Sequence, residues 1–169
     1  MNRVLLASAA LLLLLPAAGA AAKSTDRNQA MSIDAGGQSG NLDGDGKTLL
    51  SGGVVVTQGS LEIRSSAAEI YMAGGEISRS VFTGKQVKMK QQMDNGSWMD
   101  AQADRVEYDM KTETITFIGN YTVKSDRGSN SGQRMVYNTK TGNVQAGGDG
   151  SRIKTVIQPK TAAPAQGKN

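Results

Sequence analysis

Residues 108–120 read YDMKTETITFIGN, and residues 137–149 read YNTKTGNVQAGGD. Tyr, Lys, Thr and Gly fall in register between the two stretches. A looser copy relates 49–57, LLSGGVVVT, to 116–124, TFIGNYTVK. A repeat of this length that contains strands and turns is typical of stacked β-units. One unit cannot bury its own apolar face, so neighbouring units must stack around a common interior.

Apolar and polar residues alternate between the turns. The alternation is clearest in 61–64, 85–90, 104–110, 114–118 and 121–125. Strict alternation over short windows indicates half-buried strands. After residue 22 no window has the pattern of an amphipathic helix. The sequence therefore predicts an all-β protein of many short strands, each of about four to seven residues.

The apolar positions of these strands define a predicted interior that is rich in methionine. Its members are Met31, Ile33, Val54, Val56, Leu61, Ile63, Tyr71, Val87, Met89, Val106, Tyr108, Met110, Ile115, Phe117, Tyr121, Val123, Met135, Tyr137 and Val144. Methionine is flexible and fills irregular space. The interior is therefore either an ordinary core with methionine as filler, or a core that opens to admit an apolar ligand. The residues alone leave both readings open.

The first 22 residues have the features of a cleaved export signal. Arg3 is followed by an apolar run over 4–15, which is too short to span a membrane as a helix. Ala20 and Ala22 fit an A-x-A cleavage site and leave Lys23 as the first mature residue. We expect one domain over 23–158. The Ala, Pro, Gln and Lys of 159–169 predict a disordered tail.

Charge and composition exclude several classes of function. The net charge of +4 comes mainly from 150–169, which hold four basic residues and no acidic one. The body is close to neutral, so no nucleic-acid surface is expected. The chain has no histidine and no cysteine, which removes zinc sites and His or Cys catalysis. The sequence DGDG at 43–46 fails as a calcium loop because position twelve is Val54.

Acidic residues do not suggest catalysis either. Glu107 and Asp109 share one strand face, but that face is opposite Tyr108 and Met110 and should point to solvent. We therefore predict no enzyme activity, no metal and no cofactor. The function classes left open are an apolar-ligand carrier and a structural or adhesive β-solenoid. A carbohydrate-active enzyme would need a face lined with aromatic rings and paired acids, whereas the only tryptophan is Trp98.

The chain resembles the periplasmic lipopolysaccharide-transport protein A family, also called the OstA-like family. Four stretches carry the resemblance, which spans about residues 30–158: GGVVVTQGSLEIRSSAAEIY at 52–71, MDNG at 93–96, ADRVEYDMKTETITFIGN at 103–120 and RIKTVIQP at 152–159. The resemblance implies an open, incomplete β-jelly roll, in which antiparallel strands form a V-shaped trough. It also implies a periplasmic protein that holds lipopolysaccharide acyl chains and passes the lipid between the two membranes.

The resemblance further implies partners and site residues. An LptC-like inner-membrane protein would join the N-terminal edge at 29–35, and an LptD-like outer-membrane translocon would join the C-terminal edge at 152–158. Copies would associate head to tail. The lipid-contacting positions of the family fall on Met31, Met89, Tyr108 and Met110. The alternation adds Ile33 and Phe117 to the groove interior. Phosphates on the lipid head would favour cations at the rim. The candidates are Arg64, Lys88, Lys90 and Arg105, although a solvated strand face is the default expectation for each of them.

Overall fold

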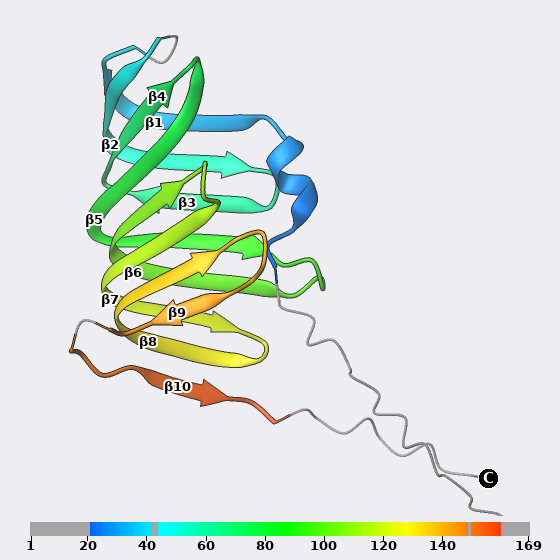
Figure 1. Cartoon of the computed structure of the whole chain (residues 1–169). Helices are drawn as coiled ribbons and strands as arrows, with labels where there is room; N and C mark the ends of the chain where they lie inside the picture. The colour runs from blue at the N-terminus through cyan, green and yellow to red at the C-terminus, as the bar shows by residue number, and fades with distance from the viewer. Residues whose placement is uncertain (1–20, 42–43, 149, 160–169) are drawn as a thin grey trace, which may run out of the picture.

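The computed structural model describes residues 21–41, 44–148 and 150–159 (Figure 1). One 3-10 helix, η1, precedes ten strands that form a continuous antiparallel sheet. The elements are η1 (Ser24–Asn28), β1 (Met31–Ser39), β2 (Gly46–Gln58), β3 (Leu61–Ser65), β4 (Ala67–Ala73), β5 (Glu76–Gln92), β6 (Trp98–Asp109), β7 (Thr114–Ser125), β8 (Gly128–Asn138), β9 (Val144–Ala146) and β10 (Lys154–Ile157). No helix in the described ranges is long and apolar enough to cross a membrane.

The all-β prediction is confirmed, but the prediction of uniformly short strands is wrong. β5 has 17 residues and contains the predicted 85–90 strand. The predicted 114–118 and 121–125 strands are halves of the single 12-residue β7. The reason is that the glycine between these halves bends the strand without ending it. The pairing register shifts there, between Ile118 and Tyr121, as it does at a β-bulge.

These bends lie side by side and fold the sheet into two facing layers. The strand halves of layer A are 31–35, 54–58, 61–65, 87–92, 98–103, 121–125, 128–132 and 154–157. The strand halves of layer B are 37–39, 46–50, 67–73, 76–83, 105–109, 114–118, 134–138 and 144–146. Buried side chains of both layers pack into one core. The result is a trough that is closed along the fold line and has its mouth at the opposite, turn-bearing side.

Glycine is required at the fold line for two reasons. Gly52 and Gly119 have φ values of 76° and 77°, which residues with a side chain rarely adopt. A Cβ on Gly119 would lie 2.6 Å from Oδ2 of Asp104, and one on Gly52 would lie 3.0 Å from Cα of Gly36. Gly52 and Gly119 are also the aligned glycines of LLSGGVVVT and TFIGNYTVK. The looser sequence repeat therefore marks two copies of the same bend.

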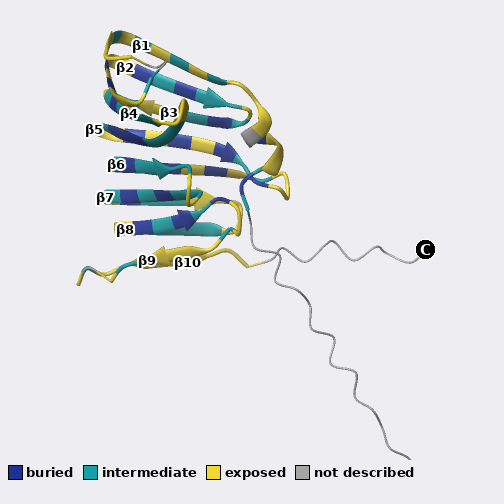
Figure 2. Cartoon of the chain, turned by 45° about the horizontal axis from the view of Figure 1, so that its top comes forward, coloured by how far each residue is buried: buried dark blue, intermediate teal, exposed yellow. Residues whose placement is uncertain are grey.

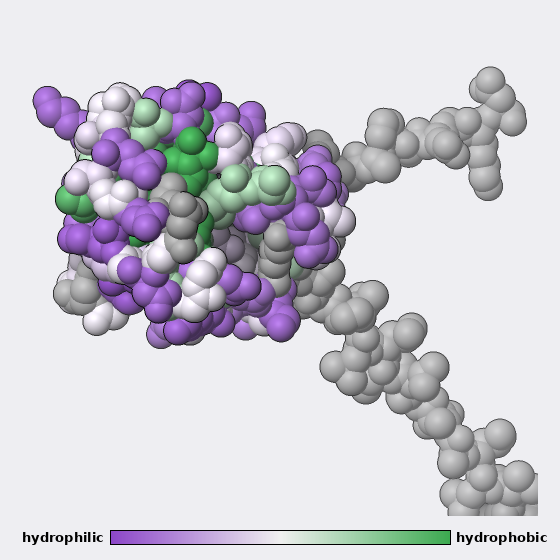
Figure 3. Space-filling view, turned by 90° about the horizontal axis from the view of Figure 1, so that it is seen from above, coloured by the Kyte–Doolittle hydropathy of each residue, from purple (hydrophilic) through white to green (hydrophobic). Residues whose placement is uncertain are grey.

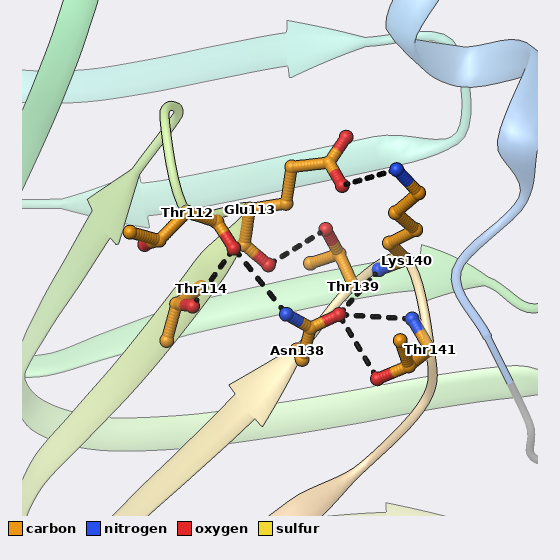
Figure 4. Close-up of polar contacts among 7 residues, drawn as sticks. All are labelled: Thr112, Glu113, Thr114, Asn138, Thr139, Lys140 and Thr141. Carbon is orange, nitrogen blue, oxygen red and sulfur yellow. Dashed lines mark hydrogen bonds and ion pairs between the residues drawn. The ribbon is translucent and has the colours of Figure 1, made fainter.

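The 29-residue repeat marks two copies of the same turn (Figure 4). In the first copy, Asp109 Oδ1 accepts a hydrogen bond from Thr112 N at 2.9 Å. In the second copy, Asn138 Oδ1 accepts one from Thr141 N, also at 2.9 Å. Both turns belong to layer B and they touch, because the Asn138 amide donates to Thr112 O at 3.3 Å. Repetition therefore places equivalent turns next to each other along the mouth.

Burial confirms most of the predicted interior (Figure 2). Twelve of its members are buried: Val54, Val56, Leu61, Ile63, Val87, Met89, Val106, Ile115, Phe117, Tyr121, Met135 and Tyr137. Two assignments are wrong. Tyr71 lies on the outer face, where its hydroxyl donates to Glu69 and Arg79 lies over its ring. Val144 is 55 % exposed at the layer B end of the mouth.

Candidate functional site

The mouth of the trough has two apolar openings. The first opening, of about 400 Å³, is lined by Met31, Gln58, Glu76, Ile77, Tyr108, Met110 and Glu113. The second opening, of about 190 Å³, is lined mainly by Met93, Met99, Val123, Met135, Tyr137 and Val144, with the polar turn at 125–127. Each opening takes residues from both layers. The trough interior is therefore accessible from the side where the strand turns face each other.

The structure brings together three of the predicted site residues. Met31 comes from the start of β1, while Tyr108 and Met110 come from the end of β6 and the turn after it. Ile33 follows Met31 on the same face of β1 and packs against the core. These residues meet because β1 and β6 both present alternate side chains to the interior.

Met89 and Phe117 lie deeper. Met89 is 2 % exposed and Phe117 is fully buried, and both pack within the closed core between the layers. Neither side chain lines either opening of the mouth. In this structure they form the floor on which the accessible residues rest.

The second opening was missed by reasoning from the sequence, although the repeat contained a signal for it. Tyr137 is the equivalent of Tyr108 in the 29-residue repeat, and the two tyrosines occupy equivalent ends of β8 and β6. Each one lines an opening. Reading the repeat as a copy of the site, as well as a copy of the turn, would have predicted the second opening.

Apolar surface is visible where the trough is viewed from its β1 end (Figure 3). Hydrophobic residues gather near the centre of this view, and hydrophilic residues surround them. A contiguous apolar surface with a polar border is typical of a binding surface in a folded protein. Apolar ligand chains could be removed from water here while a polar group attached to them stays outside.

The structure favours the solvated strand face for the four rim candidates. Arg64, Lys88 and Lys90 surround a hollow of about 360 Å³ on the outer face of layer A, pointing away from the interior. Their positions alternate with the inward-facing Ile63 and Met89. The hydrogen bond from Arg64, at 2.6 Å, lowers the pKa of Glu62. Lys90 lies over the ring of Trp98, with 4.7 Å between Nζ and the ring centroid.

Arg105 is also on an outer face, where it helps to neutralise Glu107. Arg105 Nε lies 2.7 Å from Glu107 Oε1, and Arg79 Nη2 lies 2.6 Å from Glu107 Oε2. Burial raises the pKa of Glu107, but the two arginine hydrogen bonds outweigh this effect and hold it below the usual range. A carboxylate fixed in this way serves to join β5 and β6. In the described ranges no cluster of three or more His, Cys, Asp or Glu residues could hold a metal ion.

An antiparallel trough with an apolar mouth and polar outer faces defines a class of carrier for molecules with apolar chains. The family comparison agrees. Residues 32–143 match the model of LptA/(LptD N-terminal domain) LPS transport proteins. The match covers more than half of the chain, and the chain belongs to this family. This assignment disfavours the structural or adhesive β-solenoid.

Individual relatives show the same relationship over most of the chain. The lipopolysaccharide export system protein LptA of Haemophilus influenzae is 32% identical over 148 residues, which is 85% of each chain. The protein of the same name from Escherichia coli K12 is 29% identical, over 98% of this chain and 93% of its own length.

A solved structure supports the fold. LptH, the LptA-homologous periplasmic component of the lipopolysaccharide transport device of Pseudomonas aeruginosa, superposes with a TM-score of 0.71 and 26% identity. The match covers 80% of this chain and 99% of that one. The predicted family and the predicted trough are confirmed.

Proposed function

We propose that this protein carries lipopolysaccharide across the periplasm, with acyl chains entering the mouth of the trough and the sugar head remaining outside. The observation that carries the proposal is the pair of apolar openings at the mouth of a family member. Methionine lines both openings, and its flexible side chain suits a surface that must accommodate several chains. Transport of this kind requires no catalytic group, cofactor or metal.

Lipid contact is assigned first to Met31, Tyr108 and Met110, which line the first opening. Ile33 supports them from the same strand face. Met89 and Phe117 would contact lipid only if the layers moved apart, because both are buried in the closed trough. We therefore rank the six predicted site residues by their access to the mouth.

The two ends of the sheet supply docking surfaces. Within the described ranges, β1 pairs only with β2 and β10 pairs only with β8, so each has one unpaired edge. An unpaired edge can accept a strand from another chain. The proposed arrangement places an LptC-like protein at the β1 edge, an LptD-like protein at the β10 edge, and further copies of this chain head to tail between them.

Site-specific photocrosslinking tests the lipid site. A photoreactive residue at Tyr108 should form an adduct with lipopolysaccharide in the periplasm of a Gram-negative cell. Tyr71 is a matched control, because it is also a partly exposed tyrosine but lies on the outer face. Adducts at both positions would indicate nonspecific contact. The absence of adducts at Met31, Tyr108 and Met110 in the folded protein would refute lipid transport through this mouth.

The edges are tested separately from the lipid. Removing the residues from 154 onward deletes β10 and leaves β8 as the C-terminal edge. The shortened protein should lose concentration-dependent association in sedimentation experiments. Because β10 contributes only exposed side chains, the remaining sheet should stay folded. Unchanged self-association would place the contact between copies elsewhere.

A further inference from the structure

One polar side chain, Gln91, lies at an inward position of layer A that the strand pattern reserves for apolar residues. Along the second half of β5 the inward positions are Val87, Met89 and Gln91, which alternate with the exposed Lys88 and Lys90. Gln91 is only 5 % exposed. A polar residue at a core position of an alternating strand is unfavourable unless it has a function. The glutamine therefore needs a physical explanation.

The side-chain carbonyl of Gln91 is buried and unpaired. Oε1 is shielded from solvent and accepts no hydrogen bond from any part of the chain that the structure describes. Asp26, which is equally buried, does have a partner, because the Ser60 hydroxyl donates to its carboxylate. Buried polar atoms of native proteins are nearly always paired, and an unpaired carbonyl in an apolar core costs free energy. A donor from another molecule would remove this cost.

The neighbours of Gln91 are apolar and offer no donor. Met99 is its register partner on β6, and Met89 and Met93 occupy the inward positions before and after it along the chain. Leu61 lies at the adjacent position of β3. All four neighbours belong to the hydrophobic core. Three of them are methionines, whose side chains are flexible and can move to admit another group.

Gln91 lies next to the second opening of the mouth. Its neighbours Met93 and Met99 both line that opening. β5 ends at Gln92, so Gln91 is one residue, or about 3.4 Å, from the mouth end of the strand. An apolar chain that enters by displacing the two methionine side chains would bring its first few carbons past the Gln91 carbonyl.

This arrangement points to a particular kind of chain. We propose that Gln91 Oε1 accepts a hydrogen bond from a hydroxyl group on the acyl chain, carried within a few carbons of the carbonyl that joins the chain to the head group. The depth of Gln91 sets the position of the hydroxyl, because the head group stays outside while the start of the chain passes the mouth. Gln91 is thus a specificity-determining residue for hydroxylated acyl chains. This inference rests on the proposed function.

One contact would satisfy two groups that are each unfavourable alone. A hydroxyl on an acyl chain loses its hydrogen bonds to water when it enters an apolar trough, and Gln91 Oε1 restores one of them. The same contact pairs the buried carbonyl. A plain chain would leave the carbonyl unpaired, and sites built to bond a hydroxyl discriminate strongly against analogues that lack it. The discrimination is therefore a property of the site as well as of the ligand.

Two other buried oxygens share the lack of a partner but are in the wrong place. They are Thr48 Oγ1 and Ser65 Oγ, which are unpaired within the described part of the chain. Neither residue lines either opening, and neither do their register partners Ile70 and Val54. Thr48, which is fully buried in layer B, therefore provides a matched control for Gln91.

Competition binding tests the preference. The probes are 3-hydroxytetradecanoate and tetradecanoate, each measured by its displacement of fluorescently labelled lipopolysaccharide from the full-length mature protein. Wild type should bind the hydroxylated chain more tightly. The ratio of the two affinities should fall about two- to twelvefold in Gln91→Met, which corresponds to one net hydrogen bond. Thr48→Val should keep the wild-type ratio.

The position of the hydroxyl is tested with 12-hydroxytetradecanoate. Its hydroxyl lies far from the head, so this chain should bind wild type no more tightly than tetradecanoate does. Equal affinity of wild type for all three chains would overturn the proposal, and so would an unchanged ratio in Gln91→Met or chains that displace no lipopolysaccharide. A folded wild type that binds no lipopolysaccharide at all would instead refute the proposed function, and this inference with it.

Thermal stability without lipid gives a second readout. Methionine has nearly the shape of glutamine and removes the unpaired carbonyl, so Gln91→Met should melt at the wild-type temperature or above it. The same variant should have lost its preference for the hydroxylated chain. Higher stability with lower selectivity is the combination expected of a residue retained for its ligand. A melting temperature several degrees below wild type would show that the carbonyl is already paired in the free protein, and would overturn the proposal.

Discussion

The attachment of β10 depends on one glycine, which makes Gly128→Ala an informative substitution. Gly128 begins β8 opposite Ile157, with a φ of 137°. A Cβ at this position would lie 1.9 Å from the carbonyl oxygen of Val156, whereas real Cβ contacts are not closer than 3.0 Å. β10 would have to move by the difference, about 1.1 Å, at a backbone that has no flexible side chain to yield.

The energetic result can be estimated from the pairing. β10 forms four register pairs with β8, and all four of its side chains are exposed. Hydrogen bonds of about 0.5–1.5 kcal/mol each hold it, so a shift of this size removes on the order of 2–6 kcal/mol of local stability. The core contains no residue of β10. Gly128→Ala should therefore release β10 while the rest of the sheet unfolds only a few degrees earlier.

Residue-resolved hydrogen exchange measures this directly. The Val156 and Ile157 amides should lose protection, and amides of β6 and β7 should retain it. Gly148→Ala is the control, because its φ of 86° gives a comparable backbone strain while a Cβ there meets nothing within 4 Å. Protected β10 amides in Gly128→Ala would refute the reasoning, and so would cooperative unfolding of the whole sheet. Released β10 should also weaken the association proposed at this edge.

Three further substitutions test the fold and its electrostatics. Glu113 has a φ of 53° where the repeat has Gly142, so Glu113→Gly should stabilise the protein by about 1 kcal/mol in denaturant titrations, and a loss of stability would mean that the interactions of the Glu113 side chain, such as its ion pair with Lys140, outweigh the backbone strain. Phe117→Ala should cost about 3–5 kcal/mol by the same measurement, because the ring is fully buried; a cost below 1 kcal/mol would show that the floor of the trough is loosely packed. Glu107 has a lowered folded-state pKa, so its contribution is present above the unfolded pKa of about 4.3 and is lost as pH falls through the folded value. The melting-temperature difference between wild type and Glu107→Gln should therefore shrink below about pH 4.3, and a difference independent of pH would exclude the charge as its source.

The alternation and the repeat in the sequence predicted the features that depend on residues close together in the chain, which are the strands and the turns. Alternation identified the strands, and the repeated Lys-Thr motif identified turns that share a side-chain cap from Asp109 or Asn138. The family resemblance supplied the trough. Met31, Tyr108 and Met110 were then predicted together, and the structure places them at one opening. Their role in binding lipid remains a prediction.

Three features could not be read from alternation alone. A bulge inserts a residue and changes which side chains point inward. The register of β4 shifts directly after Tyr71, which alternates with the buried Ile70 and was assigned to the wrong face. β6 has such a shift between Gln102 and Arg105. Alternation also assigns a residue to a face without stating its depth, which is why Phe117 and Tyr108 looked equivalent. The position of Ala22 depends on contacts with Met93 and Thr139, which lie about 70 and 117 positions away in the chain.

The expected signal peptide and tail fall mostly outside the described residues. Residues 1–20 and 160–169 are not described by the structure. The predicted boundary after Ala22 therefore stays a prediction. The intact mass of the exported protein would test this boundary.

The number of strands in the sheet sets the length that each copy adds to an assembly joined edge to edge. Eight strands, β1-β2-β3-β5-β6-β7-β8-β10, follow one another along the axis of the trough. Neighbouring strands are about 4.8 Å apart, so each copy joined edge to edge would add about 38 Å. A filament of such copies could grow or shrink only in whole steps of this size. The number of copies in the assembly would then set the distance that it spans between two membranes, and the strands themselves would not change.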